Sequence, residues 1–330
     1  HYKLDRFILE AIPLFNPATF LRKSLKMLYD KHIIIAHTDY PAFIFSFLRK
    51  IDMKNIPLIF DMHGFLIAER LISDSKSIYL RIPFYFLMEK INLSSSTKIL
   101  CVSRKAMYYL NRNKGVNWDK MLYVPNGVDL SFFRPLKNIK RVFMLKRKLH
   151  LENKFVFGYI GGLQKWQGVK NFIKAAFLTN DKMIHFLIVG GHDSWRRRNV
   201  VKLKRVPRAE IAYYYSLCDV LVLPRPYHIA TEVAAPTKFA EYVAMGKPVL
   251  VTNVSDAAEL TKKHECGIVI PNNSPYTLRK GFYDFIELSE RELEKMGRNS
   301  RKLAEEEFDW SKIIARLNIE LTKLRTLEKI

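Results

Sequence analysis

The hydrophobic residues of the chain fall into short continuous runs rather than the strict alternation of a half-exposed sheet. In the first half these runs predict strands at residues 33–36, 56–60, 99–102 and 121–124. In the second half they predict strands at residues 155–160, 185–189, 220–223, 248–251 and 267–270, with a helical segment between each and the next. Strands that are hydrophobic on both faces are typical of a parallel sheet covered by helices, so the pattern predicts an α/β fold.

The two series of strands predict two domains. They are separated by the Asn126-Gly127 turn, by Arg134-Pro135 and by a basic stretch at residues 137–148. We expect an N-terminal, acceptor-side domain over residues 1–140, a second domain over residues 141–310, and a C-terminal helix over residues 311–330 that packs back on the first domain. Each domain is expected to be a doubly wound, Rossmann-like unit whose ligand lies at the carboxyl ends of the strands. Because the chain begins at His1 in the middle of a pattern, we also expect that the first domain lacks an N-terminal segment.

Composition narrows the class of protein. The 330 residues are 48% hydrophobic and 26% charged, which is typical of a folded globular chain. The three cysteines, Cys101, Cys218 and Cys266, are far apart and odd in number, which excludes a disulfide scaffold and favours a reducing, cytoplasmic location. No apolar run approaches the roughly 18 residues that a membrane-spanning helix needs.

The formal net charge of +23 predicts an anionic partner: a nucleic acid, an anionic membrane or a phosphorylated small molecule. The first 150 residues carry most of this charge, and at residues 20–28 (FLRKSLKML) the basic side chains alternate with apolar ones. That mixture suits a helix lying on the inner face of a membrane, and a solvated helix face is the alternative. The three arginines at residues 196–198 are interpreted as a solvated loop, and contact with an acidic acceptor is the alternative.

A glycine-rich loop follows the strand at residues 155–160. It begins with Gly161-Gly162, ends at Gly168 and leads into a helix with apolar residues at helical spacing. Glycines let the backbone approach an anion closely, and the N–H groups at a helix start donate to it, so the layout indicates a phosphate-binding loop. An ordinary tight turn is the alternative.

A second candidate is the helix predicted between Pro236 and Gly246. Its first two turns carry Thr237, Lys238 and Glu241, which are spaced three and four residues apart and therefore share one face. A lysine beside a helix N-terminus suits a diphosphate, and a carboxylate one turn deeper suits the vicinal hydroxyls of a ribose. A surface Lys/Glu pair is the alternative interpretation.

Three runs in this order resemble the family 4, group 1 glycosyltransferases: VPNGVDLSFFRP at residues 124–135, GYIGGLQKWQG at residues 158–168 and PTKFAEYVAMGKPVLV at residues 236–251. The resemblance covers nearly the whole chain. It extends to PLIFDMHG at residues 57–64 and to CVS at residues 101–103. It implies the GT-B fold, in which two Rossmann-like domains face each other across a cleft, and a reaction that retains the anomeric configuration.

The resemblance also implies roles for single residues. His63 would contact the transferred sugar or its phosphate, Gly161 and Gly162 would shape the diphosphate loop, and Glu241 would bind the donor ribose. Asn126 and Gly127 would lie at the interdomain cleft.

The chain departs from the family pattern at several of its charged positions. Gly162 and Gln167 stand where the family often has Arg and Lys, so Lys238, and after it Lys165 and Arg225, are the candidates to replace those cations, with Thr237 beside them. The expected sugar-contacting glutamate falls at Val233. Glu232 takes that role if the preceding loop carries one extra residue, and it is otherwise a surface residue.

From these features the sequence predicts a retaining, metal-independent glycosyltransferase without a cofactor. It would move a sugar from a nucleotide diphosphate sugar to a lipid-linked or polysaccharide-precursor acceptor, with Lys238, His63 and Glu232 as catalytic candidates. A nucleotide-sugar epimerase of the same fold and a basic nucleic-acid-binding protein are the alternatives. The histidines lack metal-ligand spacing, so no metal site is expected.

Overall fold

The computed structural model describes residues 33–51, 56–72, 76–136 and 139–327, and these residues form two compact units. The first unit comprises His1–Val124 with Ile314–Ile330, and the second comprises Pro125–Ile313. The basic run at residues 20–28, which we interpret as a membrane-surface helix, lies outside the described residues.

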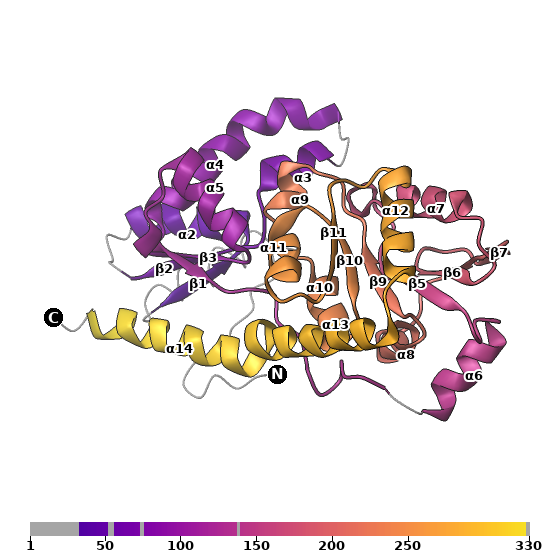
Figure 1. The fold of residues 1–330 in the computed structure, drawn as a ribbon. Helices are drawn as coiled ribbons and strands as arrows, with labels where there is room; N and C mark the ends of the chain where they lie inside the picture. The colour runs from indigo at the N-terminus through magenta and orange to yellow at the C-terminus, as the bar shows by residue number, and fades with distance from the viewer. Residues whose placement is uncertain (1–32, 52–55, 73–75, 137–138, 328–330) are drawn as a thin grey trace. The chain divides into compact units, whose positions relative to one another are not determined.

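The first unit is built on a parallel sheet with the strand order β1-β2-β3-β4 (Figure 1). Its strands are β1 (Ile34–His37), β2 (Leu58–Met62), β3 (Lys98–Cys101) and β4 (Met121–Tyr123). Its helical segments are α2 (Asp39–Ile51), α3 (Leu66–Ile72), η1 (Lys76–Arg81), α4 (Ile82–Ser95), α5 (Arg104–Lys114) and η2 (Trp118–Lys120). The four predicted strands are confirmed to within two residues. β2 and β3 consist mostly of buried side chains, whereas β1 and β4 are only partly buried.

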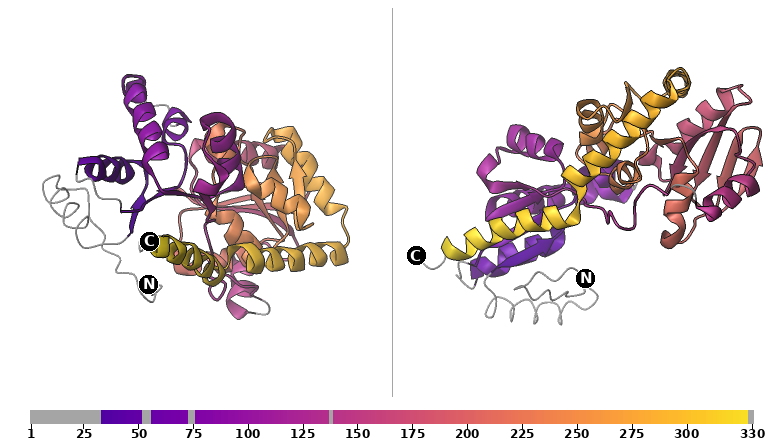
Figure 2. Two further views of the ribbon diagram at one scale, coloured as in Figure 1. Left: turned by 90° about the vertical axis from the view of Figure 1, so that its left-hand side faces the viewer. Right: turned by 60° about the horizontal axis from the view of Figure 1, so that its bottom comes forward.

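The C-terminal helix α14 (Trp310–Leu327) completes this unit. Leu321 and Leu324 are buried against Ile59 of β2 and Leu100 of β3. Figures 1 and 2 show this part of α14 running along the side of the sheet away from α4. The apolar face of α14 therefore covers one face of this sheet, and α2, α4 and α5 also pack on its strands.

The second unit contains a seven-stranded sheet with the order β11-β10-β9-β5-β6-β8-β7, and only the β7–β8 pair is antiparallel. Its strands are β5 (Phe155–Ile160), β6 (Ile184–Val189), β7 (Trp195–Arg197), β8 (Val200–Leu203), β9 (Val220–Leu223), β10 (Val249–Thr252) and β11 (Gly267–Ile270). Its helical segments are α6 (Lys140–Lys148), η3 (Lys165–Gln167), α7 (Val169–Leu178), η4 (Arg208–Glu210), α8 (Ile211–Ser216), α9 (Ile229–Glu232), α10 (Thr237–Ala244), α11 (Ser255–Lys263), α12 (Pro275–Ile286), α13 (Glu290–Leu303) and η5 (Ala304–Phe308).

Two cores cover the two faces of this sheet, because alternate residues of each strand point to opposite sides. In β5, Val156 and Ile160 belong to the core under α8, α10 and α13, whereas Phe157 and Tyr159 belong to the core under α7 and α12. The second core is rich in aromatic rings, and Phe157 stacks on Phe186 with ring centroids 5.9 Å apart. The double covering confirms the predicted doubly wound arrangement.

Two strands of the second unit, β7 and β8, were not predicted from the sequence. Residues 195–197 form β7, which pairs with β8, so the arginine triplet read as a solvated loop lies largely in an edge strand. Arg196 and Arg197 are exposed there, and polar side chains on a short outer strand leave little hydrophobic signal. The helix predicted between β6 and the next strand of the series is therefore only the short α8.

The division between the units falls between Val124 and Pro125, earlier than residue 140, where the basic stretch suggested it. The residues after Val124 already belong to the second unit. Val128 pairs with Asp309 in an isolated parallel bridge, and Phe133 is buried in the core under α8 and α10.

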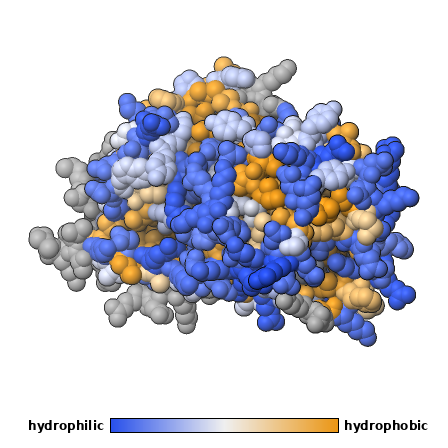
Figure 3. Space-filling view, viewed as in Figure 1, coloured by the Kyte–Doolittle hydropathy of each residue, from blue (hydrophilic) through white to orange (hydrophobic). Residues whose placement is uncertain are grey.

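The surface of the described residues carries apolar side chains in separate patches. On the face in Figure 3 one of these patches lies at the top of the view, over the segment formed by η1 and α4. The exposed residues Tyr79, Leu80, Phe84, Phe86 and Leu87 belong to this segment, and the side chain of Leu80 is 92% exposed. Within the described part of the chain, no helix combines the length and the apolar composition that crossing a bilayer requires.

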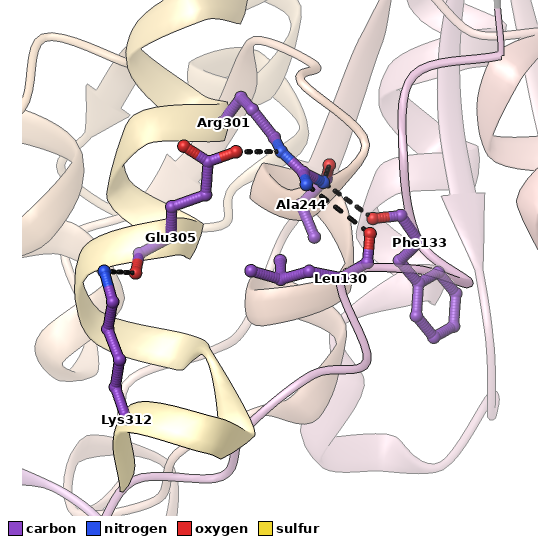
Figure 4. Close-up of polar contacts among 6 residues, drawn as sticks. All are labelled: Leu130, Phe133, Ala244, Arg301, Glu305 and Lys312. Atoms are coloured by element: carbon purple, nitrogen blue, oxygen red, sulfur yellow. Dashed lines mark hydrogen bonds and ion pairs between the residues drawn. The ribbon is translucent and has the colours of Figure 1, made fainter.

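Arg301 of α13 holds three segments of the second unit together (Figure 4). Its guanidinium donates to the carbonyl oxygens of Phe133 (2.9 Å), Ala244 (2.8 Å) and Leu130 (3.4 Å), and its Nε contacts Glu305 at 2.6 Å. The segment that enters the second unit is thereby fixed to the C-terminal ends of α10 and α13.

Candidate functional site

Glycines with positive φ shape the loops after β5 and β6. Gly161 has φ near +149°, and a Cβ there would lie 1.9 Å from Cε of Lys238. Gly190, which follows β6, has φ near +155°, and a Cβ there would lie 2.0 Å from the carbonyl oxygen of Gly161. The two loops therefore touch through their backbones at the carboxyl edge of the sheet, where a doubly wound fold binds its ligand.

A cavity of about 820 Å³ opens between these loops. Its walls come from the ends of β5 and β6 and from the segment before α8: Ile160–Gln164, Val189–Asp193, Arg205–Arg208 and Ile211. The N–H groups of Gly161 and Gly190 already donate to the carbonyl oxygens of Val189 and Leu203. The N–H groups of Gly162 and Gly191, with the side chains of Arg205 and Arg208, make this wall suited to an anionic ligand. The volume lies in the range of small-molecule sites.

Lys238 lies against Gly161, a residue of the cavity wall. It occupies the second position of α10, and its Nζ is 5.7 Å from the ring centroid of Tyr159. Burial and the neighbouring Arg225 lower the pKa of Lys238 to about 8. Arg225 is itself buried and acts electrostatically on both Lys238 and Tyr159. The structure thus brings Gly161, Lys238 and Arg225 together, as binding of one diphosphate by all three would require.

Glu241 is held in a defined orientation one turn deeper in α10. Its Oε2 accepts a hydrogen bond of 2.6 Å from the hydroxyl of Tyr215, and its Oε1 lies 3.5 Å from Nη2 of Arg208, a residue of the cavity wall. Burial raises the pKa of Glu241, and Tyr215 and Arg208 oppose that shift. The carboxylate is therefore fixed beside the cavity with hydrogen-bonding capacity left for a ligand hydroxyl.

Other candidates in the second unit have different surroundings. Glu232 ends α9, and its Oε2 accepts a hydrogen bond of 2.9 Å from the backbone N–H of Ser255 at the start of α11. Asn126 donates to the carbonyl of Ala235 at 2.7 Å, directly before α10. The sugar-contacting role of Glu232 stays a prediction, and so does the place of Asn126 at an interdomain cleft.

Three further candidates also stay predictions. Lys165 begins the 3₁₀ turn η3 on the glycine loop, and Thr237 is exposed at the first position of α10. Gly127 lies under the indole of Trp310, where a Cβ would lie 2.5 Å from the ring.

In the first unit His63 follows β2 and belongs to a compact polar cluster. Its Nε2 lies 3.1 Å from Oδ2 of Asp61 and 3.1 Å from Nδ1 of His37, and the same Nδ1 lies 2.7 Å from the Asp61 oxygen. The hydrogen bond to Asp61 raises the pKa of His63. Burial would raise the pKa of Asp61, but the hydrogen bonds from His63 and His37 hold it below its usual value.

Sequence reasoning missed part of this site. Tyr215, Arg208 and the Gly190-Gly191 loop were not singled out, although a second glycine pair directly after a strand repeats the signal of Gly161-Gly162. The sequence analysis did not single out His37 either. No local pattern marks Tyr215 or His37, because their partners lie far away in the sequence.

Comparison with known sequences matches both parts of the chain to glycosyltransferases. Residues 143–303 match the family described as "Glycosyl transferases group 1", and residues 5–132 match "Glycosyltransferase Family 4". The chain belongs to the group 1, family 4 glycosyltransferases. Among the relatives of this glycosyltransferase is CapM of Staphylococcus aureus, described as a capsular polysaccharide biosynthesis glycosyltransferase. It is 25% identical over 243 residues, which span 68% of this chain and 60% of CapM.

Solved structures share the fold of this glycosyltransferase. HepE of Anabaena, solved in complex with UDP, has a TM-score of 0.72 and 18% identity, covering 92% of this chain and 82% of HepE. Sucrose-phosphate synthase of Thermosynechococcus elongatus also has a TM-score of 0.72 and 18% identity, covering 96% of this chain and 81% of that one. These similarities confirm the predicted GT-B fold with its two Rossmann-like units.

Proposed function

We propose that this glycosyltransferase moves a sugar from a nucleotide diphosphate sugar to an acceptor, with retention at the anomeric carbon. The contact between Lys238 and the Gly161 loop carries the proposal, because it places a lysine, glycine backbone and a helix N-terminus at one point beside the cavity. That combination suits a diphosphate. A UDP donor is the first choice to test, since HepE was solved with UDP.

Each part of the site then has a task in the transfer. Departure of the diphosphate leaves positive character on the sugar ring and negative charge on the leaving group, so catalysis depends on stabilising the leaving group. Lys238, Arg225 and the loop N–H groups would supply that stabilisation without a metal ion at the diphosphate. Glu241, oriented by Tyr215, would accept hydrogen bonds from the ribose hydroxyls.

The acceptor side would lie in the first unit. His63 would contact the transferred sugar or its phosphate there, and its hydrogen bond to Asp61 keeps the imidazole in one orientation. Retention by attack from the side of the departing phosphate, which takes up the acceptor's proton, is the mechanism that family membership supports. CapM is named for capsular polysaccharide biosynthesis, which favours a polysaccharide precursor or a lipid-linked sugar as acceptor.

We further propose that the protein works at an anionic membrane surface, where a lipid-linked acceptor would be found. The net charge of +23 and the exposed apolar residues of η1 and α4 support this proposal together, because basic and apolar groups are what such a surface attracts.

The donor site is tested by thermal unfolding with UDP, GDP, ADP and CDP. One nucleotide at about 100 times its Kd is expected to add about 2.7 kcal/mol of stability and to raise Tm by several degrees. Lys238→Ala and Glu241→Ala should lose most of that rise. Lys280→Ala and Glu287→Ala, which change exposed side chains of the same types, should keep it. If no nucleotide stabilises the protein, or if all four variants respond alike, the proposed donor site is wrong.

A further inference from the structure

Two histidines and one aspartate converge at the carboxyl edge of the first sheet. His37 ends β1 and pairs in register with Asp61 of β2, and His63 lies two residues beyond Asp61. Side chains at in-register positions of neighbouring strands, and at alternate positions of one strand, point to the same face. The backbone therefore directs all three side chains to one place, although His37 is 24 residues away from Asp61 in the sequence.

The three polar atoms at that place form a small triangle. Its sides are 2.7 Å from Nδ1 of His37 to Oδ2 of Asp61, 3.1 Å from Nε2 of His63 to the same oxygen, and 3.1 Å between the two nitrogens. Protons cannot satisfy all three sides. If Nδ1 of His37 and Nε2 of His63 both carry a proton, their two N–H groups point at each other. If only one of them carries a proton, the lone pair of the other nitrogen faces the carboxylate oxygen.

A metal ion at the apex above this triangle would satisfy all three atoms at once. Bonds of about 2.0–2.2 Å that meet at about 90–109° place neighbouring ligand atoms about 2.8–3.6 Å apart, close to the observed sides. We propose that His37, Asp61 and His63 form a binding site for a divalent transition-metal ion such as Zn²⁺ or Co²⁺. Two imidazole ligands favour these ions over Mg²⁺ and Ca²⁺, which take oxygen ligands.

The surroundings support a cation and leave it open to a further ligand. Glu69 of α3 adds a negative charge that acts on His63, although the chain as a whole is strongly basic. The side chains of His37 and His63 are 65% and 41% exposed. An ion held by three protein atoms on this open edge keeps coordination positions for water or another oxygen ligand.

Titration of the untagged full chain with Co²⁺ and with Zn²⁺ alone tests the site. The visible absorption of Co²⁺ reports its ligands, and calorimetry gives the Zn²⁺ affinity. We expect one ion per chain. His37→Ala and Asp61→Ala should each weaken metal binding by at least about 100-fold. Even the loss of a residue that only orients a metal ligand lowers the metal affinity about 10- to 100-fold.

The matched control is His150→Asn, which removes an exposed imidazole outside the cluster at a position with φ near +47° that asparagine tolerates. It should bind the ions like the unaltered chain. Absence of one-to-one binding to a folded chain, or equal affinities in His37→Ala and His150→Asn, would overturn the site. Neither readout requires sugar transfer, so the result is independent of the proposed function.

Discussion

At the scale of single residues, the site of the second unit depends on charged groups that the fold partly removes from water. Lys238 contacts Gly161, its Nζ is 5.7 Å from the centroid of the Tyr159 ring, and the buried Arg225 acts on it electrostatically. Burial and the like charge both disfavour its protonated form, so its pKa falls to about 8. A bound diphosphate would favour the protonated form again.

This linkage predicts a pH dependence of nucleotide binding. Below about pH 8 Lys238 is already charged, and above it binding must include uptake of a proton, so the affinity for UDP is expected to fall as the pH rises. Between pH 7 and pH 9 the loss should be about 5- to 10-fold, measured by calorimetry. Lys238→Arg stays charged over this range and should flatten the profile. The same slope in both proteins would contradict the assignment.

At the scale of elements, α13 illustrates how a helix with strong local signals gains a tertiary role. Its N-terminus has a capping box in which Ser289 and Glu292 satisfy each other's backbone N–H groups. Near its other end is Arg301, which donates to the carbonyl oxygens of Leu130, Phe133 and Ala244. The cap is visible in the sequence as S-x-x-E, whereas the carbonyl partners are not.

Arg301→Ala is therefore expected to reduce the free energy of unfolding by about 2–3 kcal/mol, because it removes charged hydrogen bonds to backbone carbonyls that the surrounding helices partly bury. Arg298→Ala on the same helix is the matched control. Its ion pair with Glu294 is 3.4 Å long and mostly exposed, so its loss should change stability by less than about 0.5 kcal/mol. Chemical denaturation of both variants measures the difference. Equal effects would show that the Arg301 contacts contribute little.

At the scale of the whole molecule, each unit combines a sheet with helices that cover it, and the first unit is completed by the end of the chain. Leu321 and Leu324 are buried on β2 and β3, so residues that follow the entire second unit belong to the core of the first. The first unit also carries the exposed large apolar residues of the η1–α4 segment, on which the proposed membrane contact rests.

Sedimentation with vesicles tests the membrane proposal. The protein should sediment with vesicles that contain anionic lipid, less so with neutral ones, and salt should release it, because the attraction is partly electrostatic. The double variant Leu80→Ser, Leu87→Ser should reduce the bound fraction severalfold. Tyr227→Ser with Tyr276→Ser, which alters two other exposed apolar residues, should not. Failure of the unaltered protein to sediment at low salt would contradict the proposal.

The sequence by itself determined the strands other than β7 and β8, the α/β class and the α10 candidates. Buried parallel strands such as β5 and β9 are continuous apolar runs, and the glycine pair and the Lys238–Glu241 spacing are local patterns that imply their own geometry. Three separated motifs that resemble those of the family 4, group 1 glycosyltransferases predicted the family, and the sequence comparisons confirm it.

Only the tertiary structure decided which distant residues meet. The pairing of β1 with β2 brings His37 to Asp61 and His63, the packing of α8 on α10 gives Glu241 its partner Tyr215, and the edge strand β7 takes its place beside β8. The physical reason is the same in each case. Local periodicity shows which face of a segment is buried, but register and packing between segments far apart in the chain depend on the shapes of both surfaces, which no single window of sequence contains.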